Sequence, residues 1–242
     1  KLSEKVEVTI EVNPDDISLN YLYSLSESGV NRISLGLQSF ENKELILMNR
    51  VHNAEQGLQA LEWTSKVFEN YSLDLIFGVP FSNITSWNKN LDITLSFKPP
   101  HISAYALTIE SNTVLSFKVK NKLIELLDEE IVKEQYDLLI SKLEEASYEN
   151  YEFSNFSKLG FESINNFSYW SRKPYLGIGP SAHSYDGIRR RSWNISNNLK
   201  YLKFIEKGEL SSKNEILNDN DLFNEYVMIG LRTRGVSLNE IN

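Results

Sequence analysis

The chain has 242 residues, 41% of them hydrophobic and 24% charged, and its formal net charge is −8 at pH 7. This composition allows a buried core, and the acidic balance argues against non-specific binding to nucleic acid or anionic membranes. The chain has no cysteine, so these residues offer no disulfide, no thiolate metal site and no thiol nucleophile. No apolar run approaches the roughly 20 residues of a bilayer span, and no signal-like segment opens the chain. We therefore predict a cytoplasmic protein.

The first 110 residues alternate between strand and helix signals. Strands are predicted where apolar residues alternate with polar ones or form short buried runs, and helices where leucines recur at helical spacing. The predicted order is a strand at 6–12, a helix at 19–29, a strand at 31–37, a helix at 54–68, a strand at 73–80, a helix from about 85 to 95 and a strand at 101–107. This alternation predicts an α/β fold of parallel strands with helical crossovers.

Two architectures satisfy this pattern, a closing barrel and an open doubly wound sheet. Polar residues on the inward-facing positions favour a barrel with a ligand at its mouth. Four strands cannot close a barrel, so we expect further strands upstream. The far end points the same way, because Ser237 and Glu240 form a capping box that predicts a helix just where the chain stops.

After residue 110 the pattern changes. Asp128 is predicted to cap a helix whose buried stripe is Val132, Tyr136, Leu139, Leu143 and Ala146. An aromatic, asparagine-rich stretch at 148–170 follows, then a glycine-rich turn region at 175–187 and a last helix at 219–231. We predict three regions: a partial barrel at 1–110, a C-terminal region at 111–210, and the start of a further helical domain at 211–242.

The strand at 31–37 has one bulky face and one small face. Ile33, Leu35 and Leu37 alternate with Ser34 and Gly36. A strand has a side-chain period of two, so the apolar residues share one face and can pack against helices. A second face that only filled a core would be bulkier. We therefore predict that it leaves room for a ligand.

Polar residues that fit a ligand site fall at or near the ends of the predicted strands. Acids can hold an ammonium group or a ribose hydroxyl, an amide can donate and accept, and an arginine can grip a carboxylate. Together such groups would suit a zwitterionic nucleoside. Taken singly, each could instead be a helix cap, a loop contact or a surface ion pair. The residues are Glu11, Gln38, Asp74 and Thr108, with Arg50 in the connection after the second strand.

Three other features have plainer explanations from the residues alone. Gly177 and Gly179 fit a tight turn better than a phosphate loop. The arginines at 189–191 fit a solvated basic run, and His183 alone fits a structural histidine. The three histidines lie far apart with no zinc spacing, so no metal site is predicted.

A set of ordered motifs resembles a known family. The chain resembles the oxygen-independent coproporphyrinogen III oxidase family of radical S-adenosylmethionine (SAM) proteins, and it is most similar to their HemW branch of haem chaperones. The resemblance covers nearly the whole chain. The motifs are "EVNP" at 11–14, "NRISLGLQSF" at 31–40, "NR.H" at 49–52, "DLIFGVP" at 74–80, "HISAYALTIE" at 101–110, "YEFSNF" at 151–156, "NNFSYW" at 165–170 and "YLGIGPSAHSY" at 175–185.

The resemblance implies a six-stranded partial TIM-like barrel, of which this chain would hold the last four strands. It implies SAM beside a 4Fe–4S cluster, and a small inner face at Ser34 and Gly36 would leave space for SAM. The cluster would be held by a CxxxCxxC loop that this cysteine-free chain lacks. By carry-over, the residues implied to contact SAM are Glu11, Gln38, Arg50, Asp74 and Thr108, with His183 near it.

The resemblance also implies a haem-facing segment at Asn165, Asn166, Tyr169 and Trp170. The HemW branch often has histidine where this chain has Asn165, and an amide is a poor iron ligand beside imidazole. Tyr169 and Trp170 could stack on a porphyrin or could fill the core.

Three functions follow from these alternatives. The first is a haem chaperone with haem as cargo and a haem-acceptor protein as partner. The second is a radical enzyme that oxidatively decarboxylates coproporphyrinogen III to protoporphyrinogen IX. The third is a non-catalytic barrel that serves as an interaction module.

Overall fold

The computed structural model of the protein describes residues 6–233 and 235–237. The chain divides into two compact units, Lys1–Glu162 and Ser163–Asn242. The sequence predicted region boundaries at 110 and 210, whereas residues 111–162 lie within the first unit. The reason is that two short strands of this segment hydrogen-bond to the end of the parallel sheet.

The first unit is a sheet of four parallel strands and an antiparallel hairpin, in the order β1-β2-β3-β4-β6-β5. Helices connect the parallel strands, as predicted. The elements are β1 (Thr9–Val12), the 3-10 helix η1 (Pro14–Asp16), α1 (Leu19–Glu27), β2 (Arg32–Gln38), α2 (Asn42–Leu47), α3 (Ala54–Val67), β3 (Tyr71–Phe77), α4 (Ile84–Ser96), β4 (His101–Ala106), α5 (Val114–Lys120), α6 (Glu129–Glu145), β5 (Glu149–Glu152) and β6 (Asn155–Ser157).

Local sequence signals explain where the helices begin. Asn53 and Asn83 form capping boxes with Gln56 and Ser86 at the starts of α3 and α4. The Asp128 side chain accepts a hydrogen bond from the Glu130 amide and caps α6, as predicted. Each cap satisfies backbone donors that would otherwise lack a partner in the first turn.

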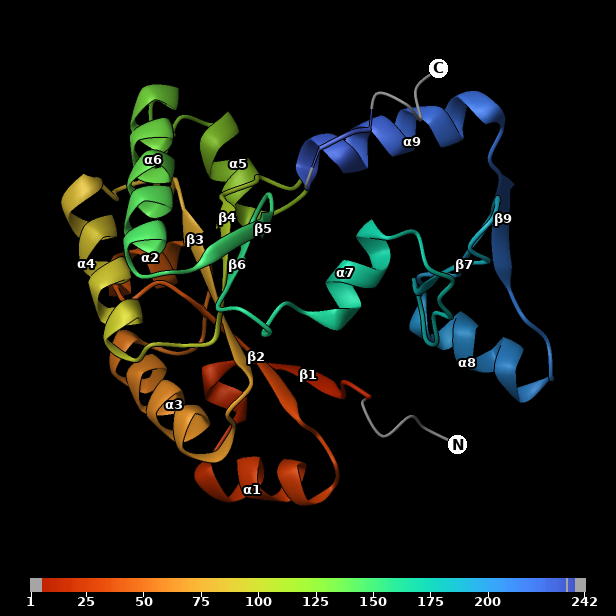
Figure 1. The fold of residues 1–242 in the computed structure, drawn as a ribbon, viewed down its shortest axis with the longest axis horizontal. Helices are drawn as coiled ribbons and strands as arrows, with labels where there is room; N and C mark the ends of the chain where they lie inside the picture. The colour runs from red at the N-terminus through yellow and green to blue at the C-terminus, as the bar shows by residue number, and fades with distance from the viewer. Residues whose placement is uncertain (1–5, 234, 238–242) are drawn as a thin grey trace. The chain divides into compact units, whose positions relative to one another are not determined.

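The core lies between the sheet and its helices. Ile33, Leu35 and Leu37 of β2 are fully buried, as are Leu73 and Leu75 of β3. Figure 1 shows α3, α4 and α6 on one side of strands β2–β4. Of the stripe predicted for α6, Leu139 and Leu143 are fully buried and its other three residues pack against this core, so that prediction is confirmed.

The second unit holds a three-stranded antiparallel sheet in the order β7-β8-β9. The elements are α7 (Ile164–Trp170), β7 (His183–Tyr185), β8 (Arg190–Asn194), α8 (Asn198–Glu206), β9 (Ser212–Ile216) and α9 (Asp219–Arg232). The last helix confirms the prediction for 219–231. The helix predicted from the capping box of Ser237 and Glu240 lies outside the described residues.

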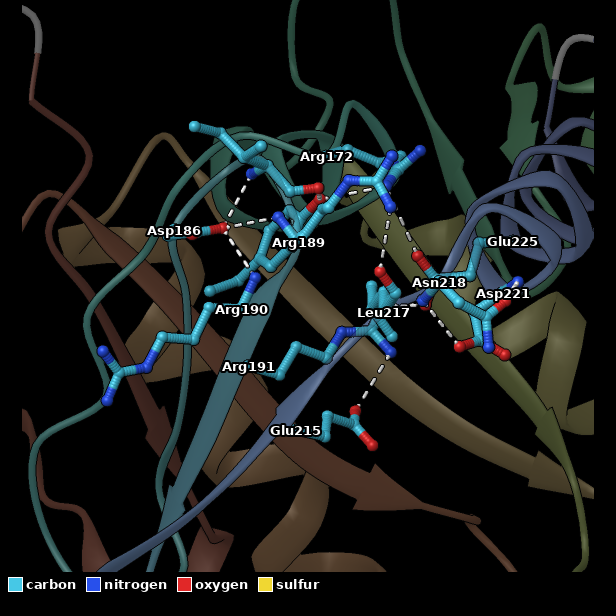
Figure 2. Close-up of polar contacts among 12 residues, drawn as sticks. Arg172, Asp186, Arg189, Arg190, Arg191, Glu215, Leu217, Asn218, Asp221 and Glu225 are labelled. Atoms are coloured by element: carbon cyan, nitrogen blue, oxygen red, sulfur yellow. Dashed lines mark hydrogen bonds and ion pairs between the residues drawn. The ribbon is translucent and has the colours of Figure 1, made fainter.

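The arginine run at 189–191 is largely held by ion pairs within the second unit (Figure 2). Arg189 pairs with Asp219 at the start of α9 and donates to the Leu217 carbonyl at 3.3 Å. Arg191 pairs with Glu225 of α9 and lies 3.7 Å from a Glu215 carboxylate oxygen. Arg190 is exposed. Two of the three arginines therefore fasten α9 and β9 to β8 and do not form a free basic surface.

Among the described residues, no helix is long and apolar enough to cross a membrane.

Candidate functional site

One face of the parallel sheet is lined by small and polar side chains. Glu11 of β1 is in register with Ser34, Ser34 with Ser72, and Ser72 with His101. Residues in register across neighbouring strands point to the same face of a sheet. The face opposite the leucine-rich core is therefore a polar row that crosses all four parallel strands.

Asp74 lies at the centre of this face. Ser34 Oγ donates to the two Asp74 carboxylate oxygens at 3.3 and 3.1 Å, and Ser72 Oγ donates to Oδ1 at 3.3 Å. Burial raises the pKa of the Asp74 carboxyl because it penalises the charged form, while the serine hydroxyls, including that of Ser103, oppose this shift. A buried carboxylate with donors on its inner side can accept further hydrogen bonds or a positive charge on its open side.

His101 extends the network toward the hairpin. Its Nδ1 lies 2.7 Å from Ser72 Oγ and its Nε2 lies 2.7 Å from Tyr151 Oη. Burial, together with Arg32, lowers the pKa of His101 to about 3. The imidazole is therefore neutral at physiological pH, and it links the Asp74 cluster to β5 as a positioning group.

A glycine and two long side chains form a cradle beside Asp74. Arg50 Nη2 donates to Gly36 O at 2.9 Å and to Asn13 Oδ1 at 2.7 Å. A Cβ added at Gly36 would lie 3.0 Å from Gln38 Nε2 and 3.1 Å from Arg50 Nη2. Gln38 itself adopts a left-handed φ of 69° at a register shift that ends the pairing of β2. The backbone thus turns so that Gln38 and Arg50 converge over Gly36.

A Gly36→Val substitution tests this cradle. The β-branched side chain would displace the ends of Gln38 and Arg50, so we expect SAM affinity to fall at least tenfold while the fold is retained. Isothermal titration with SAM or S-adenosylhomocysteine measures the effect, and circular dichroism checks the fold. Gly160→Val is the matched control, because nothing lies within 4 Å of a Cβ added there; its positive φ makes some loss of stability expected, but not of affinity. Unchanged affinity in Gly36→Val would contradict the role of the cradle.

A buried acid holds the loop between Gln38 and Arg50. Ser39 Oγ donates to Glu44 Oε2 at 2.6 Å, and Asn90 of α4 accepts from the Phe40 amide at 2.9 Å. Burial raises the pKa of the Glu44 carboxyl. This network connects α2 to α4 and so helps to fix the position of α2, which precedes Arg50 in the chain.

Thr108 lies apart from the Asp74 cluster, in the loop after β4. It borders a pocket of about 390 Å³ that Ile76 of β3 and Asn49, the neighbour of Arg50, also line. Its hydroxyl donates to Ala106 O at 3.4 Å. Most of the pocket wall is apolar, with side chains from α2, the loop after β4 and α5. Such a pocket suits a flat ring.

The remaining predicted residues belong to the second unit. His183 is exposed on β7, and its ring stacks on Trp193 with centroids 5.9 Å apart. Asn165, Asn166, Tyr169 and Trp170 lie on α7. Tyr169 is 46% exposed and meets the Tyr175 ring edge-on at 4.6 Å. The structure thus brings Glu11, Asp74, Gln38 and Arg50 to one sheet face, and places His183 and the α7 residues on other elements.

Sequence analysis missed Ser72, Ser103 and His101 as members of the polar face. A signal was present, because these residues fall at the same alternate positions in β3 and β4 as Ser34 and Gly36 do in β2. Tyr151 had no local signal, since its contact with His101 depends on the pairing of β6 with β4. Among the described residues, no group of three or more His, Cys, Asp or Glu side chains is placed to hold a metal ion.

The chain is similar to a family model, to curated proteins and to a solved structure. The family model of the radical SAM superfamily matches residues 1–92. Heme chaperone HemW of Bacillus subtilis (strain 168) is 36% identical over 238 residues, which cover 97% of this chain and 62% of the relative. Heme chaperone HemW of Lactococcus lactis subsp. lactis (strain IL1403) is 34% identical over 230 residues, which cover 94% of this chain and 60% of the relative.

Among solved structures, coproporphyrinogen III oxidase (HemN) from Escherichia coli matches with a TM-score of 0.75 and 23% identity over 94% of this chain and 55% of that one. This likeness confirms the predicted fold class, an α/β fold with part of a radical-SAM TIM-like barrel. The radical SAM match over residues 1–92 and the similarity to the two HemW proteins support a HemN/HemW-like radical SAM family, as the sequence motifs indicated. The chain spans about 60% of the length of these two HemW relatives.

Family membership implies SAM and a 4Fe–4S cluster as cofactors, and the residues present fit only the first of them. The buried Asp74 carboxylate and the Gln38 and Arg50 side chains that converge over Gly36 suit a polar nucleoside that carries both a positive charge and a carboxylate, such as SAM. The cluster needs thiolates. None of the 242 residues is a cysteine, so these residues do not supply its ligands.

Proposed function

We propose that the protein handles haem as a HemW-type member of this family and binds SAM on the polar sheet face. One observation carries this proposal. The radical SAM match ends at residue 92, whereas the similarity to proteins named heme chaperones runs through 97% of the chain and so includes the second unit.

In this proposal the SAM contacts are Glu11, Gln38, Arg50, Asp74 and Thr108. Asp74 and Glu11 offer carboxylates to the ammonium group and the ribose hydroxyls, and Arg50 offers a guanidinium to the carboxylate of the ligand. Gln38 offers an amide beside Gly36, and the apolar pocket beside Thr108 takes the flat base. When bound at an iron–sulfur cluster, SAM supplies radical chemistry.

The haem-facing residues in the proposal are those of α7. Tyr169 presents an exposed ring, and Trp170 follows it on the same short helix. Aromatic faces stack on a porphyrin macrocycle. Asn165 and Asn166 offer amide groups and supply no strong iron ligand. Haem would be cargo passed to an acceptor protein.

Two binding measurements on the chain test the proposal. We expect haemin to bind with a dissociation constant in the micromolar range or below, seen as a shifted Soret band at one haemin per chain. We also expect SAM to bind independently of haemin. Absence of saturable haemin binding would overturn the haem-handling function. The SAM titration would then decide by itself whether the chain binds SAM.

A second function has one observation in its favour. The Asp74 cluster and the cradle at Gly36 gather carboxylate, amide and guanidinium groups on one sheet face, and a pure haem carrier would not need this set of groups. It would instead serve a radical enzyme that decarboxylates coproporphyrinogen III. The assay is formation of protoporphyrinogen IX by the whole protein, reconstituted anaerobically with iron and sulfide and given SAM and a reductant. Product would establish the oxidase, and 5′-deoxyadenosine without product would exclude it.

A further inference from the structure

Three side chains of different chemistry form a row across the sheet of the second unit. His183 of β7 is in register with Trp193 of β8, and Trp193 is in register with Lys213 of β9. They therefore share one face of the sheet. With strands about 4.8 Å apart, the imidazole and the ammonium start from backbones roughly 10 Å apart, with the indole between them. All three border a pocket of about 300 Å³ whose remaining wall is mostly serine hydroxyls.

The neighbouring row on the same face is already engaged. Tyr185, Arg191 and Glu215 are in register two residues along, and Glu225 of α9 pairs with Arg191 (Figure 2). The other row is open, because His183 and Lys213 are exposed and Trp193 is half-buried. The row of His183, Trp193 and Lys213 is therefore open to a ligand, whereas in the neighbouring row Arg191 pairs with Glu225 of α9.

His183 is the imidazole of this chain that can meet a ligand. The chain has three histidines. His52 is 2% exposed, with Nε2 3.1 Å from Leu37 O and Nδ1 3.6 Å from an Asp15 carboxylate oxygen. His101 is 1% exposed, and both of its ring nitrogens are engaged with Ser72 and Tyr151.

Imidazole is one of several haem-iron ligands that proteins use, the others being thiolate, thioether and phenolate groups. The chain has no cysteine, two methionines and twelve tyrosines, so the case for His183 rests on its position beside Trp193 and Lys213. The motif resemblance implies a histidine where this chain has Asn165, and an amide is a poor iron ligand beside imidazole. The imidazole at 183 can fill that role on a different element.

We propose that His183 is an axial ligand of haem iron in this protein, with Trp193 against the macrocycle and Lys213 paired with a propionate. This inference rests on the proposed haem-handling function. The chemistry of the row matches the cargo, since a porphyrin offers iron, an aromatic surface and carboxylates in one molecule. The His183 ring stacks on Trp193, and both side chains border the pocket.

Haemin titration of the chain and its variants tests the assignment. We expect His183→Ala to bind haemin at least tenfold more weakly and to lose the low-spin ferric spectrum of an imidazole-ligated haem. Added imidazole should restore that spectrum. Asn220→Ala, at an exposed position of α9, is the control and should leave both affinity and spectrum unchanged. His183 is exposed, so near-ultraviolet circular dichroism should show that the variant folds.

Lys213→Gln tests the propionate contact. We expect it to weaken haemin binding three- to tenfold and to leave binding of the haemin dimethyl ester unchanged. Lys207→Gln, at the end of α8, is the charge-matched control. If wild type binds haemin and His183→Ala keeps the same affinity and spectrum, this inference is wrong while the proposed function stands. If wild type does not bind haemin, the proposed function itself fails.

Discussion

Replacing Asp74 by alanine is expected to weaken SAM binding by about 1–3 kcal/mol, or roughly 5- to 150-fold. The carboxylate is the buried acceptor of the sheet face and is held there by Ser34 and Ser72. Its removal would leave a ligand donor without a partner and would free the serine hydroxyls. Isothermal titration with SAM measures the loss.

Asp137→Ala is the matched control for Asp74→Ala. Asp137 lies on the exposed side of α6, where it pairs with Lys133 at 2.6 Å. An exposed pair of this kind contributes little to stability, so SAM affinity should not change. Equal affinity in wild type and Asp74→Ala would show that Asp74 only braces the strands.

Asp74→Asn separates binding from stability. Because the folded pKa of Asp74 is raised, its protonated form favours folding. That contribution is complete below the ordinary value of 3.8 and is lost as pH rises through the raised value. Asparagine avoids the buried charge, so at pH 8 the variant should melt at a higher temperature than wild type and yet bind SAM more weakly. The difference in Tm should close as the pH falls toward 4. A lower Tm for Asp74→Asn than for wild type at pH 8 would contradict the claim that the buried Asp74 charge destabilises the fold.

Glu225→Ala is expected to destabilise the second unit by about 2–3 kcal/mol. The Glu225 side chain is 13% exposed, pairs with Arg191, and lies 3.6 Å from Arg172 Nη2. Its loss leaves two partly buried guanidinium groups without their shared carboxylate. The effect falls below that of a fully buried pair because Arg172 and Arg191 keep some contact with water, at 28% and 34% exposure.

Hydrogen exchange is the appropriate measurement for Glu225→Ala, since a chain of two units need not unfold in one step. Amides of β8, β9 and α9 should exchange faster, while those of β2 and β3 should not change. Glu206→Ala, at the exposed end of α8, should behave as wild type. Unchanged exchange in β8 of Glu225→Ala would show that other contacts hold α9.

The alternation of strands and helices was predictable because it depends on local periodicity. The leucines of β2 and the asparagine caps of α3 and α4 specify their elements within a few residues of chain. The small positions Ser34 and Gly36 predicted an open face, and the structure places them beside Asp74 and Arg50. The SAM roles of these residues stay predictions.

The pairings across the chain were decided by tertiary structure alone. The antiparallel addition of β6 to β4 brings Tyr151 to His101, fifty residues away, and carries the segment up to residue 162 into the first unit. The arginines at 189–191 looked like a solvated run until α9 supplied Glu225 and Asp219. The row of His183, Trp193 and Lys213 likewise exists only through strand register. Residue types and spacing determine which face of an element a side chain takes, whereas its partners depend on contacts between distant segments, which form only when the whole unit packs.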